Sequence, residues 1–258
     1  MQGFAIGSEL PDSIAILYES IHKEKSFVAI ALLTVGANVS IALVSKIVYL
    51  LNQYTTQEFM ASYGFRILFL TGALTLLLGI YIRKNILESS QFDKLVIKDK
   101  LSIFTIFHNY KLAWLKGFII CLVVSLITTI FMTTIPVILR DKFLITNHEF
   151  RDLSLYGPLI LAMSSLLFAV LSNLKNYKKL IAISFLLTAL FIILTFFVSL
   201  VVACILIALA MGGINGLFFY YMATLFPTHN RVIGISLCFN SAYVASGVIS
   251  LLISTVLV

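Results

Sequence analysis

The fold class is decided by residues 180–226, LIAISFLLTALFIILTFFVSLVVACILIALAMGGINGLFFYYMATLF. This stretch contains no charged residue. It is too long for one membrane span, because a spanning α-helix needs about 20 apolar residues. We therefore predict two spanning helices here, joined by a tight turn near Ser199.

Similar apolar segments recur along the rest of the chain. Together with the two helices above, they lie near residues 2–20, 26–50, 63–82, 113–139, 153–172, 180–198, 201–224 and 232–256. The sequence therefore predicts an all-α, polytopic membrane helix bundle with about eight transmembrane helices.

The composition agrees with a membrane protein. Of the 258 residues, 60% are hydrophobic and 11% are charged, whereas a soluble domain carries roughly 25% charged residues. The net charge of +7 lies mainly in short loops between apolar runs, so we expect a lipid bilayer and no nucleic acid as partner. Cys121, Cys204 and Cys238 lie inside apolar runs without a CxxC pair, which argues against a metal site and disulfides. Because no nucleophile–base pair or phosphate loop is evident, we predict no cofactor and no enzyme activity.

Basic residues are concentrated in alternate loops. The loops rich in basic residues, together with the helix ends beside them, contain Lys23, Lys25, Arg83, Lys84, Lys94, Lys98, Lys100, Lys111, Lys116, Lys175, Lys178, Lys179 and Arg231. The intervening loops hold Arg140, Lys142 and Arg151, with Arg66 near the start of the third helix. By the positive-inside rule the rich loops face the cytoplasm, which predicts that both termini lie outside.

One long polar connection, residues 83–112, divides the chain. We interpret it as a cytoplasmic linker between an N-terminal bundle, residues 1–82, and a C-terminal bundle, residues 113–258.

Two carboxylates interrupt the first predicted helix. Glu9 lies about 12 Å along it at 1.5 Å per residue, and Asp12, three residues later, shares its face. An acid at this depth is costly and marks a functional site. Desolvation and mutual repulsion favour a protonated carboxyl group, which gives a physical basis for proton coupling; the alternative is a neutral, hydrogen-bonded acid that faces the bundle.

Four motifs resemble those of one known family. They are QGFAIGSELPDSIAILYES (2–20), YGFRILFL (63–70), RKNILESSQF (83–92) and LFPTHNRVIGISLCFN (225–240). In this order and at this spacing they resemble the metabolite–proton symporters of the major facilitator superfamily, and the proline/betaine transporters in particular. The resemblance implies that the chain covers helices four to eleven of that fold, which agrees with both termini lying outside. Residues 1–82 are then a remnant of the N-terminal bundle with helices four to six, and residues 113–258 are the C-terminal bundle with helices seven to eleven.

One stretch departs from the family pattern. SNLKNYKKL (172–180) stands where the family has a motif close to SDRxGRR. Asn173 replaces its acid, Asn176 its glycine and Tyr177 its first arginine. The resemblance therefore implies a weaker charge relay at the cytoplasmic face.

Candidate site residues follow from the motifs and from polar groups within apolar helices. As proton or substrate candidates we take Glu9, Asp12, Asn38, Asn215 and Asn240, with interhelical hydrogen bonding as the alternative for the asparagines. As gating or structural motif residues we take Glu19, Arg66, Arg83, Glu88 and Arg231. Lys46 is expected to extend toward the outer interface. Gly212, Gly213 and Gly216 are expected to allow close helix packing. The aromatic run 218–221 could pack in the bundle or offer a cation–π wall.

The resemblance implies a proton-coupled symporter of a small zwitterionic osmolyte, such as proline or betaine, in a bacterial plasma (inner) membrane. We expect the chain to be truncated relative to that family. Two alternatives stay open: a transport-inert remnant of an interrupted gene, or a subunit completed by a separately encoded N-terminal fragment.

Overall fold

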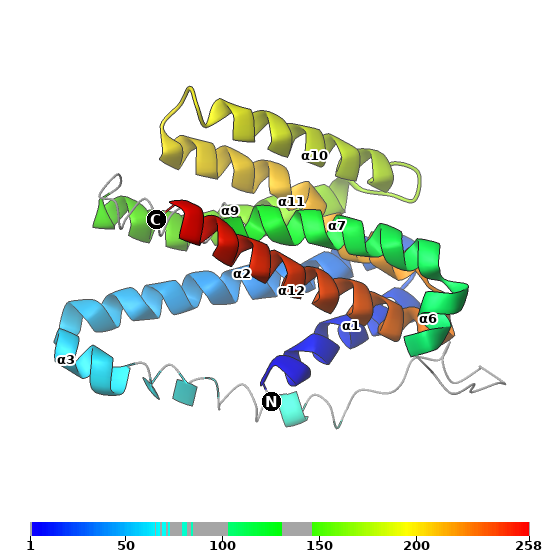
Figure 1. The fold of residues 1–258 in the computed structure, drawn as a ribbon, viewed down its shortest axis with the longest axis horizontal. Helices are drawn as coiled ribbons and strands as arrows, with labels where there is room; N and C mark the ends of the chain where they lie inside the picture. Colours follow the sequence, from blue (N-terminus) through cyan, green and yellow to red (C-terminus); the bar gives the residue numbers. More distant parts are fainter. Residues whose placement is uncertain are drawn as a thin grey trace.

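The computed structural model describes residues 2–64, 66–67, 69–70, 72, 79–81, 84, 103–130 and 146–257 (Figure 1). Over these ranges the chain is helical and contains no strand. The elements are α1 (Gln2–Ser20), α2 (Lys23–Tyr54), α3 (Gln57–Phe59), a π-helical turn (Met60–Gly64), α6 (Ile103–Asn109), α7 (Lys111–Thr129), α9 (Asn147–Leu171), α10 (Tyr177–Leu194), α11 (Leu200–Leu225), a 3-10 turn (Thr228–Asn230) and α12 (Arg231–Leu257). The predicted all-α membrane bundle is confirmed.

Six helices of the described part are long and apolar enough to cross a membrane. Their candidate spans are Lys23–Tyr54, Lys111–Thr129, His148–Leu171, Tyr177–Leu194, Val201–Leu225 and Thr228–Ile253. The predicted turn near Ser199 is confirmed, because α10 ends at Leu194 and α11 begins at Leu200. The predicted first span is the helix α1, but it does not meet the same criterion, since its 19 residues carry three carboxylates. Half of the residues in the predicted span at 63–82 lie outside the described residues.

The helix α9 begins earlier than the predicted span at 153. The reason is a capping box, in which Thr146 and Glu149 satisfy each other's backbone N–H groups. The Glu149 N–H donates to Thr146 Oγ1 at 3.2 Å, and the Thr146 N–H donates to Glu149 Oε2 at 2.7 Å. These bonds satisfy donors that a helix start would otherwise leave free.

The helix α11 lies at the centre of the bundle, in contact with α9, α10 and α2. Its glycines explain the close approach to α9. A Cβ atom at Gly212 would collide with Ser164, and one at Gly216 would collide with the backbone of Ser165. The Ser164 hydroxyl crosses the same interface and donates to the Leu209 carbonyl oxygen at 2.6 Å. The close packing predicted for these glycines is therefore confirmed.

The elements before and after the long polar connection lie side by side. In Figure 1, α1 contacts α12 and α2 runs along α9. The buried positions of α2 are confined to its first part, from Ser26 to Ala42. From residue 43 to Tyr54 no side chain of α2 is buried. The contact between α2 and the other helices is therefore tight at one end of the bundle and loose at the other.

Candidate functional site

A buried ion pair joins the end of α1 to the start of α12. The Arg231 Nη1 atom donates to Glu19 Oε1, and the two side chains are only 8% and 5% exposed, respectively. The Arg231 Nε atom donates to the Ala223 carbonyl oxygen at 2.9 Å, and Nη1 also reaches Thr228 Oγ1 at 3.4 Å. These partners compensate for burying the guanidinium, which would be strongly unfavourable without them.

An aromatic cluster supports this ion pair. The Arg231 guanidinium carbon lies 4.7 Å from the centre of the Tyr18 ring, a distance at which a cation is attracted to the face of a ring. Tyr18 in turn packs edge-on against Tyr220 of α11, and Phe27 of α2 stacks on Tyr220 at 3.8 Å. Side chains from α1, α2 and α11 therefore pack around the ion pair. The helices α1 and α2 precede the long polar connection, and α11 follows it.

The structure shows what Pro227 and Gly234 do in the motif at residues 225–240. Pro227, with φ of −66°, leads into the 3-10 turn that turns the chain from α11 to α12. A Cβ atom at Gly234 would collide with the ring of Phe226. Glycine is therefore required for Phe226 to fold back onto the first turn of α12, and this fold-back places Arg231 beside α1.

A pocket of about 750 Å³ opens beside the ion pair. Tyr18, Glu19 and Arg231 line it together with the turn between α1 and α2, which includes His22, and with Leu174 from the loop between α9 and α10. We call this end of the bundle the ion-pair end.

The loop that carries Leu174 is held by the two asparagines that depart from the family motif. The Asn173 Oδ1 atom accepts hydrogen bonds from the N–H groups of Lys175 and Asn176, both at 3.0 Å. The Asn176 Oδ1 atom accepts from the Asn173 N–H at 2.7 Å, and its Nδ2 donates to the Leu171 carbonyl oxygen at 3.1 Å. The loop is thus fixed by uncharged side chain–backbone bonds.

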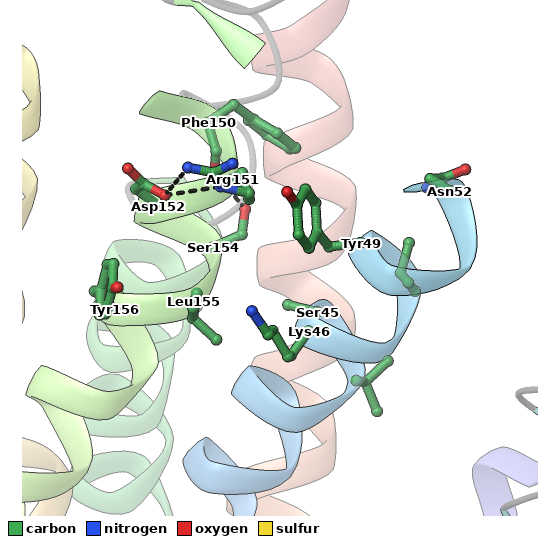
Figure 2. A pocket seen from close by; sticks show the side chains of 12 residues that line it. Ser45, Lys46, Tyr49, Asn52, Phe150, Arg151, Asp152, Ser154, Leu155 and Tyr156 are labelled. Atoms are coloured by element: carbon green, nitrogen blue, oxygen red, sulfur yellow. Dashed lines mark hydrogen bonds and ion pairs between the residues drawn. The ribbon is translucent and has the colours of Figure 1, made fainter. Parts of the chain in front are cut away.

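A second pocket, of about 670 Å³, lies between α2 and α9 at the opposite end (Figure 2). Its lining includes Lys46 and Tyr49 from α2 and Arg151 and Asp152 from α9. Tyr49 lies 26 residues further along α2 than Lys23, which corresponds to roughly 40 Å at 1.5 Å per residue. We call this the Lys46 end.

The proton and substrate candidates do not line either of these two pockets. Glu9 is exposed on α1, Asp12 is half-buried, and Asn215 is half-buried on α11. Asn38 is buried and donates to the Thr34 carbonyl oxygen of its own helix at 2.8 Å. Asn240 donates to Ser236, at 2.9 Å to the carbonyl oxygen and 3.0 Å to the hydroxyl. The role of these five residues in transport stays a prediction.

For the gating or structural motif candidates, the structure brings two of the five residues into contact. The structure brings Glu19 and Arg231 together, although the sequence motifs that contain them gave no indication that they pair. Arg66 is exposed, with its guanidinium carbon 5.8 Å from the Tyr63 ring centre. Arg83 and Glu88 lie outside the described residues. Within the aromatic run 218–221, Phe218, Phe219 and Tyr220 are buried in the core and pack against neighbouring side chains.

The sequence did not indicate that Tyr49, Arg151 and Asp152 line a pocket. One signal could have located the last two, since Thr146 and Glu149 have capping-box spacing and place residues 151 and 152 in the second turn of a helix. Nothing in the sequence indicated that this turn faces Lys46 and Tyr49 on α2.

The comparisons with known proteins agree with this architecture. The sequence pattern of the Major Facilitator Superfamily matches residues 1–253. The chain is similar to the shikimate transporter of Escherichia coli (strain K12), with 32% identity over 94 residues. That match covers 36% of this chain and 22% of the relative's length. No solved structure gives a significant match. A bundle of membrane-length helices with this sequence pattern over nearly all of its length belongs to the Major Facilitator Superfamily, a family of membrane transporters.

Proposed function

We propose that this chain moves a small solute by alternating access, with residues 1–82 and 113–258 acting as two bundles and residues 83–112 as the linker between them. In such transporters one bundle rocks against the other around a site near the middle of the membrane. The helix pairs α2–α9, α2–α11 and α1–α12 then form most of the contact between the bundles.

The observation that carries the proposal is the contrast between the two ends of this contact. At the ion-pair end, Glu19 and Arg231 bridge α1 and α12 and are buried. At the Lys46 end, α2 has no buried residue after Ala42, and a pocket opens between α2 and α9. Pockets lie at both ends, but a buried ion pair bridges the bundles at one end only. A contact bridged at one end and without buried α2 side chains at the other is the arrangement expected for one state of an alternating-access cycle. With the ion-pair end in the cytoplasm, this is an outward-facing state.

We propose a solute that carries a carboxylate, with proton symport. Proline and betaine, which the motif resemblance suggests, and shikimate, which the relative's name suggests, share this group. Glu9 is the candidate for the proton-carrying group, because it is an acid about halfway along α1.

The alternatives are a transport-inert remnant and a subunit completed by a separately encoded fragment. α1 and α2 together expose Glu9, Leu32 and Ile41, so lipid or further helices could cover this surface. Reading the DNA upstream of the codon for Met1 would show whether such a fragment is encoded.

Uptake into proteoliposomes tests the proposal. The purified chain is reconstituted, a pH gradient is imposed, and accumulation of radiolabelled shikimate, proline and betaine is measured with and without a protonophore. We expect gradient-dependent accumulation of at least one solute that the protonophore abolishes.

Liposomes without protein and liposomes with heat-denatured protein serve as controls. Absence of gradient-driven uptake of all three solutes, by protein that remains monodisperse after extraction, would contradict transport by this chain alone. Uptake that appears only after an upstream-encoded fragment is added would favour the subunit alternative.

A further inference from the structure

Two cations from different helices meet at one tyrosine in the pocket of the Lys46 end (Figure 2). The Lys46 ammonium lies 5.3 Å from the centre of the Tyr49 ring, and the Arg151 guanidinium carbon lies 5.0 Å from it. Since both distances end at the same ring centre, the two cationic groups lie within about 10 Å of each other. Solvent ions screen exposed like charges at about this separation, so the repulsion between the two groups is modest and grows if they approach each other.

The described lining of the pocket contains one carboxylate, that of Asp152, and it pairs with Arg151. Asp152 accepts from Arg151, with Nε and Nη2 both at 2.8 Å from the same oxygen, Oδ1. Among the twelve described residues that line the pocket, Asp152 is the only acid. The described lining therefore carries a net charge of +1, from two basic side chains and one acid.

Polar and apolar side chains surround Lys46 in this pocket. In Figure 2 its side chain points from α2 into the space between α2 and α9. Ser45, Tyr49, Asn52 and Ser154 add hydroxyl and amide groups to the lining, while Val44, Val48 and Leu155 add apolar walls. A cavity of about 670 Å³ is within the usual size range of small-molecule sites, about 300–1,000 Å³.

We propose that this pocket binds an oxyanion, either the carboxylate of a small solute or the phosphate of a lipid headgroup, between Lys46 and Arg151. The Lys46 ammonium supplies one charged donor, and the Arg151 guanidinium has donors beyond the two that it directs to Asp152. The Tyr49 ring lies near both cations, with its centre 5.3 Å from the Lys46 ammonium and 5.0 Å from the Arg151 guanidinium carbon. A bound oxyanion offsets the repulsion between them, so its occupancy favours approach of α2 and α9 at this end.

The site does not depend on the proposed transport activity, because binding needs neither a proton gradient nor movement across the membrane. Equilibrium binding to the purified full chain tests it directly. Shikimate is the soluble probe, measured by scintillation proximity in phosphatidylcholine nanodiscs. The lipid arm replaces part of the phosphatidylcholine by phosphatidylglycerol and follows retained lipid by native mass spectrometry.

The variants are Lys46→Gln, Lys46→Arg and the double variant Arg151→Gln/Asp152→Asn, which removes both charges of the pair and leaves neither partner alone. Lys178→Gln is the matched control, since the Lys178 ammonium also lies near a tyrosine ring, at 5.8 Å from that of Tyr177, but outside this pocket. All variants are first checked for a monodisperse elution profile.

If the solute is the ligand, shikimate binds saturably, Lys46→Gln and the double variant weaken it at least tenfold, and Lys46→Arg and Lys178→Gln bind within twofold of wild type. If the lipid phosphate is the ligand, phosphatidylglycerol is retained by wild type and lost in Lys46→Gln, and shikimate shows no saturable binding. Binding of neither probe, or binding that Lys46→Gln and the double variant leave unchanged, overturns the proposal. Failure of uptake in the proteoliposome assay with binding intact would contradict the transport proposal alone.

Discussion

Glu19 and Arg231 are 212 positions apart in the sequence, yet they form a buried ion pair that joins the last turn of α1 to the first residue of α12. The pair is held by the Ala223 carbonyl oxygen and by the Tyr18 ring. The pair stabilises the bundle. In the proposed function it also holds the two bundles together at the ion-pair end.

Removal of one partner of this pair is expected to destabilise the bundle. Glu19→Gln leaves the Arg231 guanidinium buried without a countercharge, which costs about 3–5 kcal/mol for a buried pair. Thermal unfolding in detergent should therefore show a clearly lower Tm for Glu19→Gln. The double variant Glu19→Gln/Arg231→Leu should recover part of the loss. Glu24→Gln, at an exposed position beside the same turn, is the control; an equal effect of Glu24→Gln would argue against a special role of the pair.

The packing of α11 against α9 is expected to tolerate no added side chain at Gly216. Gly216→Ala places a methyl group against the backbone of Ser165, and backbone cannot move aside as a flexible side chain can. Overpacking of this kind costs about 1–3 kcal/mol. Gly36→Ala is the matched control, since a Cβ atom there would meet no atom within 4 Å. The Tm in detergent should fall for Gly216→Ala and stay near wild type for Gly36→Ala; the reverse order would contradict the observed packing.

The loop between α9 and α10 is expected to depend on the Asn173 side chain. Asn173→Ala removes the acceptor of two backbone N–H groups, those of Lys175 and Asn176. Each such bond contributes about 0.5–1.5 kcal/mol. Hydrogen–deuterium exchange of the amides at 175 and 176 should therefore become faster in Asn173→Ala. Asn173→Asp keeps an acceptor oxygen and restores the acid of the family motif, so its exchange should resemble wild type. Unchanged exchange in Asn173→Ala would show that the turn does not need this side chain.

Glu9 is expected to be required for proton coupling if the chain transports. Glu9→Gln keeps the size of the side chain but cannot carry a transferable proton. Uptake driven by a pH gradient should be abolished, while solute exchange without net proton movement should persist. Glu58→Gln, on the short helix α3, serves as the control. Gradient-driven uptake at the wild-type level in Glu9→Gln would exclude this role for Glu9.

Properties that depend on local composition were predictable. An uncharged run longer than one span has to turn once, and the turn between Leu194 and Leu200 lies where Ser199 indicated. Small residues on α11 predicted close helix packing, and Gly212 and Gly216 provide it. The start of α9 was missed because it depends on a capping box, Thr146 with Glu149, and not on hydropathy.

Length, hydropathy and motif spacing are properties of the chain read in order, so a membrane helix bundle of a transporter family was predictable from them. Which polar groups meet depends instead on how the helices pack. A helix that is apolar on all sides, such as α11, does not reveal which face packs against which neighbour. The pairing of Glu19 with Arg231, and the approach of Lys46 and Arg151 to Tyr49, therefore follow only from how the helices pack.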